Sequence, residues 1–392
     1  LYCGFDPTAD SLHVGSLVPL LALRRFQQFG HSPIVVAGGA TGSIGDPSGK
    51  SDERQLLSQE QLKANIEGVK KQLASFLDFS CEINPARLVD NADWTARLSF
   101  LDVLRDYGKH FKVNAMVAKE SVRARMEDRD VGISYTEFSY MLLQGYDYLW
   151  LAENEKCELQ VGGSDQWGNI VLGADLIRRK LGQTAHALTW PLLTKPDGSK
   201  YGKTAGGETI WLSPEKMSPY RFYQAWISVD DSEVRKLLLQ LTFLSPDEID
   251  DLVAEHDQHP ENRLGQRTLA KELTAIVHGE QAAASAVEAS ELLFEPSADI
   301  SAVSESALEF ISREVPSTQT PTPQMAIIDC LVETGLCQSR KDAKRAITEG
   351  GIYVNGDRVN EAELSLTADH LLHGKYILLR RGKKLWHLLT SG

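Results

Sequence analysis

Two short motifs, far apart in the chain, carry the residues best suited to chemistry. His13 and Gly15 form a His-Val-Gly turn before a predicted helix, and Lys200 to Thr204 read Lys-Tyr-Gly-Lys-Thr. A helix N-terminus and two ammonium groups can together hold the phosphates of ATP while the α-phosphate is attacked. Either motif alone has an ordinary explanation, a chance turn or a solvated loop. The prediction of a phosphate site therefore rests on their combination.

A second loop adds two cations to this set. Lys50 and Arg54 follow Asp46 in a glycine-containing loop that comes after a predicted strand. With Lys200 and Lys203 they would neutralise a departing pyrophosphate, because flexible loops can close on charge that develops only in the transition state. Any one of these cations taken singly is better explained as a solvent-exposed side chain.

One helix carries a stripe of polar side chains that could recognise a ligand by hydrogen bonds. Tyr140, Gln144 and Asp147 are spaced i, i+4 and i+7 in a helix predicted over residues 136–150, which places them on one face. The alternative is a solvated face, but such a face would usually carry Lys and Glu. Tyr, Gln and Asp offer fixed acceptors to an ammonium or a hydroxyl group.

A glycine loop follows the next predicted strand. In the stretch from Gln160 to Asn169, glycines including Gly163 let a ligand approach the backbone, and Asp165 is placed to accept from ribose hydroxyls. The alternative is an ordinary turn in which the Asp caps a helix. The position of the loop at the carboxyl end of a strand favours ligand binding.

The elements around these motifs predict an α/β fold. A strand near Tyr2, a helix over 15–29 that ends at Gly30 and a strand over 33–36 are typical of a parallel nucleotide-binding sheet. We expect a Rossmann-like parallel-sheet catalytic domain with a helical insertion, then an all-α domain and a small α+β domain, to which the resemblance described below adds RNA binding. We expect the parallel-sheet domain over 1–212, with its insertion at about 88–157, and the all-α domain over 213–295. A linker is expected over 296–324, and the small α+β domain over 325–392.

Composition bounds the remaining possibilities. The net charge is −13, yet residues 325–392 carry ten Lys/Arg against eight Asp/Glu, so the tail has the opposite sign to the rest. No stretch approaches the ~20 apolar residues of a membrane span and no leader is visible, so we expect a cytoplasmic protein. Leu1 is not an initiator Met, and we expect the natural N-terminus upstream. The sequence shows no metal-ligand cluster and no Ser-His-Asp arrangement, so neither a metal site nor covalent catalysis is expected.

The chain resembles bacterial-type tyrosyl-tRNA synthetases, which are class I aminoacyl-tRNA synthetases. The resemblance rests on the run from Tyr2 to Thr8 with His13-Val14-Gly15, on Lys200 to Thr204 and on Gly162 to Asn169. Residues 325–392 are similar to an RNA-binding fold first described in a small-subunit ribosomal protein. In the family's first motif a second His normally stands where this chain has Ser16, which implies a weakened contact to the nucleotide.

The resemblance implies a role for each site residue. Those implied for the amino acid are Tyr2 and Asp147 at the phenolic hydroxyl, Asp46, Tyr140 and Gln144 at the ammonium, and Gln166 near the reacting carboxylate. Those implied for ATP are His13 and Thr8 at the γ-phosphate, Gly163 and Asp165 at the ribose, Asp6 on the adenosine side, and Gly4, Gly15 and Ser16 around the nucleotide. Lys50, Arg54, Lys200, Lys203 and Thr204 would stabilise the pyrophosphate.

The implied reaction has two steps. Tyrosine would attack ATP, which carries magnesium, and the resulting tyrosyl group would pass to the terminal adenosine of tRNA(Tyr). The resemblance also implies a homodimer. Two alternatives stay open. One is the tryptophan-specific sister enzyme, which needs no residues to bind a phenolic hydroxyl. The other is a catalytically weakened RNA-binding relative, which Ser16 suggests.

Overall fold

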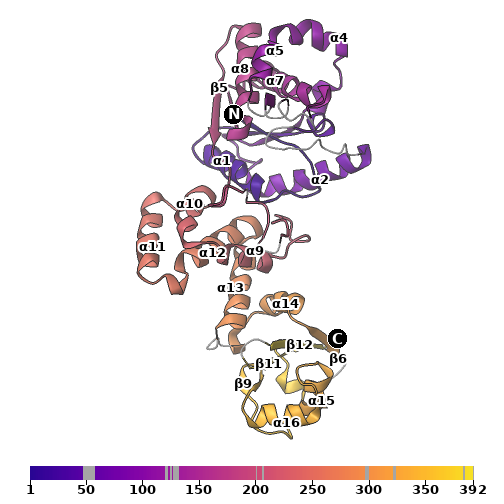
Figure 1. Cartoon of the computed structure of the whole chain (residues 1–392), viewed down its shortest axis with the longest axis vertical. Coiled ribbons are helices and arrows are strands. Elements are labelled where there is room, and N and C mark those ends of the chain that lie inside the picture. Colours follow the sequence, from indigo (N-terminus) through magenta and orange to yellow (C-terminus); the bar gives the residue numbers. More distant parts are fainter. Residues whose placement is uncertain are drawn as a thin grey trace. The chain divides into compact units, whose positions relative to one another are not determined.

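The computed structural model describes the chain except residues 47–57, 120–121, 124–125, 127–131, 200, 205–206, 296–299, 321–323, 383–384 and 392. It divides into two compact units. The first, called the N-terminal unit below, comprises residues 1–216 and 236–245. The second, the C-terminal unit, comprises residues 217–235 and 246–392. Each is described by itself (Figure 1).

A five-stranded parallel sheet forms the centre of the N-terminal unit, in the order β3-β2-β1-β4-β5. The strands are β1 (Tyr2–Phe5), β2 (Ile34–Ala37), β3 (Arg87–Asp90), β4 (Leu159–Gly163) and β5 (His186–Trp190). Strand β1 pairs in parallel with both β2 and β4, so the direction of winding reverses beside it. Open parallel sheets bind ligands at such a reversal, outside the carboxyl ends of the strands.

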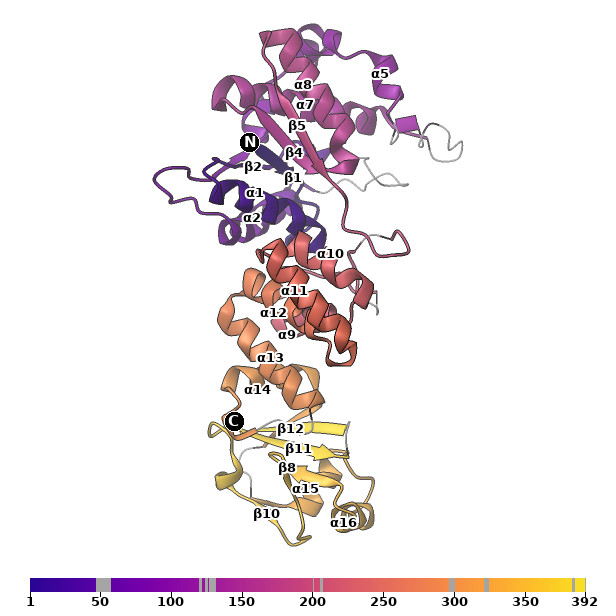
Figure 2. The same ribbon diagram turned by 90° about the vertical axis from the view of Figure 1, so that its left-hand side faces the viewer.

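Helices cover both faces of this sheet. Figure 2 shows α7 and α8 on one side and α1 and α2 on the other. Their bounds are α1 (Leu17–Gln28), α2 (Gln59–Phe76), α7 (Tyr135–Glu155) and α8 (Trp167–Leu181), with shorter helices α3 (Ala92–Thr95), α4 (Phe100–Asp102) and α5 (Val113–Val117) between β3 and α7. The predicted α/β class and parallel sheet are confirmed.

Strand alternation decides which side chains reach the site. Tyr2, Ile34 and Val36 point to the face covered by α7 and α8, where they share a core with Tyr148 and Leu149. Successive side chains of a strand point to opposite faces, so the residue after Tyr2 faces α1 instead. Helix α7 begins after Ser134, whose hydroxyl accepts from the N–H of Glu137, and this cap fixes the phase of its polar stripe.

One element of the sheet differs from the prediction. Residues 88–90 were assigned to the helical insertion, but Arg87–Asp90 form strand β3, paired in register with β2. The strand is only four residues long and its side chains are exposed or half-buried. It therefore lacks the apolar run or strict alternation by which a strand is found in a sequence.

The C-terminal unit begins with helices and ends in a mixed sheet. Its helices are α9 (Pro219–Ile227), α11 (Pro246–Gln258), α12 (Leu264–His278), α13 (Glu280–Phe294), α14 (Glu305–Glu314), α15 (Ile327–Glu333) and α16 (Arg340–Thr348), and α10 (Asp231–Leu241) is divided between the units. Its strands are β6 (Ser317–Thr320), β7 (Met325–Ala326), β8 (Ile352–Val354), β9 (Asp357–Arg358), β10 (Ser365–Leu366), β11 (Tyr376–Arg381) and β12 (Leu385–Ser391). Asn355 and Gly356 have φ of 48° and 84°, the left-handed geometry of a two-residue hairpin turn, and they join the antiparallel strands β8 and β9.

The segment predicted as a linker contains regular structure. Within residues 296–324, helix α14 buries Ala307, Leu308 and Ile311 in a core that also includes Leu292 of α13. Ser304 caps this helix. The helix has only ten residues and lies beside a proline-rich stretch, so its periodicity is lost over a longer sequence window. Among the described residues, no helix has the length and apolar character needed to cross a membrane.

Candidate active site

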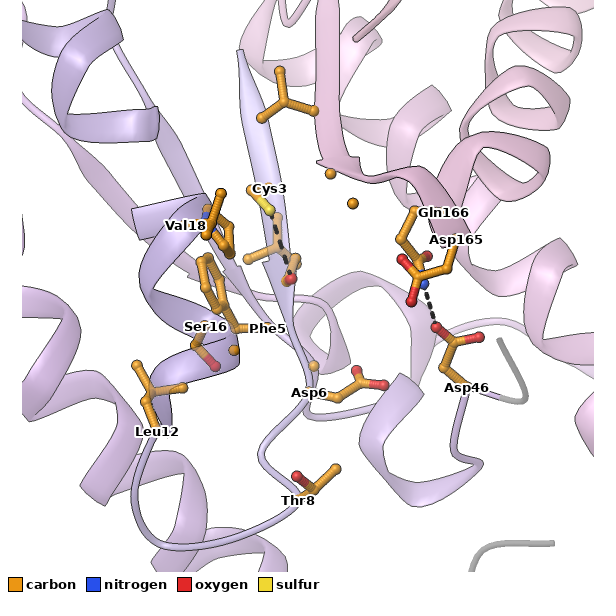
Figure 3. A pocket seen from close by; sticks show the side chains of 18 of the residues that line it. Cys3, Phe5, Asp6, Thr8, Leu12, Ser16, Val18, Asp46, Asp165 and Gln166 are labelled. Atoms are coloured by element: carbon orange, nitrogen blue, oxygen red, sulfur yellow. Dashed lines mark hydrogen bonds between the residues drawn. The ribbon is translucent and has the colours of Figure 1, made fainter. Parts of the chain in front are cut away.

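A cavity of about 490 Å³ opens at the carboxyl ends of the parallel strands. Residues of β1 and β4 line it, together with the turns that follow β2, β3 and β5. Figure 3 shows Asp46, Asp165 and Gln166 along one side of this cavity, and Cys3 and Val18 along the other. The reversal of strand order beside β1 is thus the place where the polar side chains converge.

Tyr2 and Asp147 line this cavity and lie close enough to interact electrostatically. Their exposed fractions are 2% and 4%. The hydroxyl of Tyr2 is buried and has no hydrogen-bond partner among the described residues, while its ring packs against Tyr148 at 5.4 Å between centroids. A buried hydroxyl without a partner is destabilising, so its retention beside a carboxylate indicates a place for a ligand's polar atom.

Two donors hold the carboxylate of Asp147 in place. The indole Nε1 of Trp94 donates to Oδ1 at 2.8 Å, and Nδ2 of Asn91 donates to Oδ2 at 2.9 Å. Each carboxylate oxygen has two lone pairs, so acceptor capacity is left for a third donor. A phenolic hydroxyl placed between Tyr2 and Asp147 can accept from the first and donate to the second.

Burial sets the protonation of both groups. It raises the pKa of Asp147 to about 7, against the opposing effect of the hydrogen bonds from Asn91 and Trp94. Burial also raises the pKa of Tyr2 well above its ordinary value, and the nearby Asp147 adds to this. Tyr2 therefore keeps its proton at neutral pH, whereas Asp147 changes charge there.

We expect this titration to appear in the pH profile of amino-acid use. Protonated Asp147 is neutral and therefore a weaker acceptor for a substrate hydroxyl, and its new proton competes with one of its two present donors. If only the ionised form binds productively, kcat/KM for a hydroxylated substrate should fall about tenfold per pH unit below about pH 7. Trp94→Phe removes a hydrogen bond that lowers the pKa, and should move the inflection to higher pH. A steady-state profile that is flat from about pH 6 to about pH 8 would contradict this assignment.

A second carboxylate lies beside Tyr140. Oδ1 of Asp6 accepts from the hydroxyl of Thr41 at 2.7 Å, and Oδ2 accepts from the hydroxyl of Tyr140 at 2.8 Å. A Cβ on residue 38 would lie 2.2 Å from Oδ1 of Asp6, so Gly38 makes this approach possible. The resemblance implies a place for Asp6 on the adenosine side of the site. In the structure Asp6 also contacts Tyr140, which is predicted to hold the ammonium.

Asp46 is tied to the polar stripe of α7 through an amide. Nε2 of Gln166 donates to Oδ2 of Asp46 at 2.6 Å, and Nε2 of Gln144 donates to Oε1 of Gln166 at 3.2 Å. Both carboxylates, Asp6 and Asp46, line the same cavity. Two acids together with amide and phenol oxygens make a site for a cation such as an ammonium group.

The His-Val-Gly turn gives the imidazole of His13 a fixed orientation. Nδ1 of His13 accepts from the N–H of Gly15 at 3.0 Å, so the ring proton lies on Nε2. A Cβ on residue 15 would lie 2.7 Å from Cε1 of His13, so glycine is required for this close approach. The exposed ring lines the cavity just before helix α1, where a phosphate oxygen would meet a donor.

A short ladder of backbone hydrogen bonds joins the His-Val-Gly turn to the loop that contains Lys203, the two motifs predicted to hold phosphate. His13 and Trp211 form an antiparallel bridge, and Lys203 and Thr209 form another. The N–H of Ile210 donates to the carbonyl of Gly202 at 3.0 Å. Although almost two hundred residues separate the motifs in the chain, backbone hydrogen bonds hold them side by side.

The cavity collects most of the predicted site residues. Those that line it are Tyr2, Gly4, Asp6, Thr8, His13, Gly15, Ser16, Asp46, Tyr140, Gln144, Asp147, Gly163, Asp165 and Gln166. Lys203 and Thr204 do not line it, but they follow Tyr201 and Gly202, which do. Lys50, Arg54 and Lys200 lie outside the described residues. Within the described residues no group of His, Cys, Asp and Glu is arranged to hold a metal ion.

The sequence did not point to the residues that hold the carboxylates of Asp147 and Asp6 in place. Asn91 and Trp94 follow strand β3 directly, and Thr41 follows β2. A polar side chain just after a parallel strand is the usual signal for such residues. For Asn91 and Trp94 that signal was hidden, because β3 itself was assigned to the insertion.

Comparisons with known proteins agree with this geometry. A family model described as tRNA synthetases class I (W and Y) matches residues 1–295, and one described as the tyrosine–tRNA ligase SYY-like C-terminal domain matches residues 307–389. A tyrosine–tRNA ligase of Opitutus terrae is 54% identical over 391 residues, which is 98% of this chain and 91% of that protein. One of Geobacillus stearothermophilus is 51% identical over 390 residues, which is 99% of this chain and 92% of that protein.

A solved structure extends the comparison to the fold. A C-terminally truncated mitochondrial tyrosyl-tRNA synthetase of Aspergillus nidulans superposes with a TM-score of 0.67 at 31% identity, covering 75% of this chain and 85% of that one. The match of the family model covers the whole parallel sheet and the cavity at its edge. The chain therefore belongs to the class I tRNA synthetases of the tryptophan and tyrosine family.

Proposed function

We propose that this chain is a tyrosine–tRNA ligase, which joins L-tyrosine to tRNA(Tyr) at the expense of ATP. The observation that carries the proposal is the buried pair of Tyr2 and Asp147, a phenol with no hydrogen-bond partner among the described residues and a carboxylate close enough to act on it electrostatically. Relatives about 50% identical over nearly the whole chain are tyrosine–tRNA ligases. The pair also speaks against the tryptophan-specific alternative, because an indole N–H can donate to Asp147 but cannot accept from the hydroxyl of Tyr2.

In the first step, a carboxylate oxygen of tyrosine attacks the α-phosphorus of ATP and pyrophosphate leaves. The ammonium of tyrosine binds among Asp46, Tyr140 and Gln144, with Asp6 behind Tyr140. This fixes the carboxylate near Gln166, and positioning two reactants in this way removes much of the entropic barrier. The reaction needs no covalent bond to the protein.

The nucleotide occupies the other part of the cavity. Gly163 and Asp165 receive the ribose, and ATP enters as its magnesium complex. The N-terminus of α1 and Nε2–H of His13 face the phosphates, where a helix N-terminus favours negative charge. Lys203 and Thr204, on the loop that the ladder holds against His13, stabilise the leaving pyrophosphate.

In the second step, the terminal ribose hydroxyl of tRNA(Tyr) takes the tyrosyl group and AMP leaves. We assign tRNA binding in part to residues 325–392, whose charge has the opposite sign to the rest of the chain. A homodimer would bury the exposed apolar side chains of Phe100, Leu101, Leu104 and Val113. We further propose that the enzyme works in the cytoplasm, as expected for a protein that supplies translation.

Isotope exchange between pyrophosphate and ATP tests the proposed activity. We expect exchange that depends on tyrosine, with phenylalanine and tryptophan giving little, because neither presents a hydroxyl to Tyr2 and Asp147. A signal with tryptophan alone would favour the sister enzyme. Absence of exchange with all three would favour a catalytically weakened relative, for which Ser16 is the motivating departure.

A further inference from the structure

Lys119 reaches the site from outside every sequence motif. It follows helix α5, and its ammonium Nζ donates to Oδ1 of Asn169 at 3.0 Å. Asn169 is buried in the first turn of α8. Lys119 does not line the cavity, so its contact with the site passes through Asn169.

A directed chain of hydrogen bonds runs from this lysine to Asp46. Nδ2 of Asn169 donates to Oε1 of Gln144 at 2.9 Å and to Oε1 of Gln166 at 3.3 Å. The amide of Gln144 donates in turn to Gln166. That of Gln166 donates to Asp46, as Figure 3 shows. A lysine ammonium can only donate and an ionised carboxylate can only accept. Both ends of the chain therefore demand the same orientation of all three amides.

The side chain of Lys119 packs in a defined position in the fold. A Cβ on Gly168 would lie 3.1 to 3.4 Å from Cδ, Cε and Cγ of Lys119, so the lysine stem lies directly against the backbone of α8. Burial lowers the pKa of Lys119 to about 7, and the carboxylate of Asp46 opposes this shift. A lysine that served only solubility would lie in solvent, without these contacts.

We propose that Lys119 is a positioning residue for the amino-acid substrate. Through Asn169 it orients the amides of Gln144 and Gln166, and with them Asp46, so that these groups receive the substrate ammonium. The inference rests on the proposed function, in which Gln144 and Asp46 hold that ammonium. We expect its effect on amino-acid binding, because the hydrogen bonds that lead from Lys119 run through Asn169 to Gln144 and Gln166, and from Gln166 to Asp46.

A double-mutant cycle in the full-length protein tests the inference. Lys119→Met should raise the Kd for tyrosine, measured by equilibrium dialysis, about five- to tenfold through loss of a charge-assisted hydrogen bond. The KM for ATP and kcat of pyrophosphate exchange should stay within about twofold. Adding Lys119→Met to Asn169→Ala should weaken binding no further, because a residue that acts through Asn169 has nothing left to act on.

Further variants separate positioning from folding. Lys119→Arg keeps the donor and should bind tyrosine more tightly than Lys119→Met does. Gly168→Ala displaces the lysine stem and should raise the Kd without altering Lys119 itself. Lys109→Met, at an exposed lysine, is the matched control and should change nothing. Thermal unfolding of each variant shows whether the fold is intact.

Three outcomes overturn the inference separately from the proposed function. Additive effects in the cycle, or an unchanged tyrosine Kd in Lys119→Met, would overturn it while tyrosine-dependent exchange by the parent protein still stood. An equal loss in tyrosine and ATP binding would overturn it as well, since it would mean general disruption of the site. Absence of exchange in the parent protein would overturn both proposals together.

Discussion

Asp147→Asn should lower kcat/KM for tyrosine activation about 10²- to 10³-fold. The new amide must turn an N–H toward Asn91 or Trp94, both of which already donate at this position. One buried donor then loses its acceptor, and the remaining oxygen is a weaker acceptor for the phenol. A loss of about 3–4 kcal/mol is reasonable for a buried hydrogen bond to a charged group together with an orphaned donor, and 1.4 kcal/mol corresponds to a factor of ten.

Phenylalanine supplies the internal control for this variant. It has no hydroxyl, so its much weaker activation should change little, and discrimination between the two amino acids should shrink by nearly the whole loss. Asp93→Asn, at an exposed acid near the same site, should behave like the parent protein. If Asp147→Asn reduced the use of both amino acids equally, Asp147 would be supporting the cavity and not reading the hydroxyl.

His13→Ala should lower kcat for adenylate formation about 10²- to 10³-fold, the usual effect of removing one donor aimed at transition-state charge. The KM for tyrosine should stay within about twofold, because His13 lies at the phosphate end and its contact matters only as charge moves to the pyrophosphate. Rapid-quench measurement of tyrosyl-adenylate separates this step from tRNA charging.

Two amide replacements divide the roles of the His13 ring. The amide nitrogen of Gln lies near the position of Nε2, and the amide oxygen of Asn near that of Nδ1. His13→Gln should therefore keep part of the rate, whereas His13→Asn should keep the contact to Gly15 but act like His13→Ala. Equal activity of the Gln and Asn variants would show that the ring matters only for the shape of the turn.

Much of the site follows from the sequence because its residues lie in local patterns. The stripe of Tyr140, Gln144 and Asp147 depends only on helical spacing, and α7 does run from Tyr135 to Glu155. The turn at His13 and the loop at Gly163 depend on glycines whose roles are short-range. Strand order then brings these local patterns to one edge of the sheet.

The supporting residues could not be found in this way because their roles are non-local. Asn91 acts on Asp147 from a turn 56 residues away in the sequence, after a strand with no clear apolar pattern. Lys119 acts across 50 residues through Asn169. Helix α14 was missed for a related reason. Its three buried residues are stabilised by packing into the core that contains Leu292, and this packing cannot be seen in the local sequence.

A crystal structure of the protein with L-tyrosine bound tests the central claim most directly. The account predicts the phenolic oxygen of the ligand within hydrogen-bond distance of both the Tyr2 hydroxyl and the Asp147 carboxylate, with its ammonium toward Asp46 and Tyr140. A ligand bound in the reverse direction, or one whose ring lies outside the cavity between β1 and α7, would contradict the account.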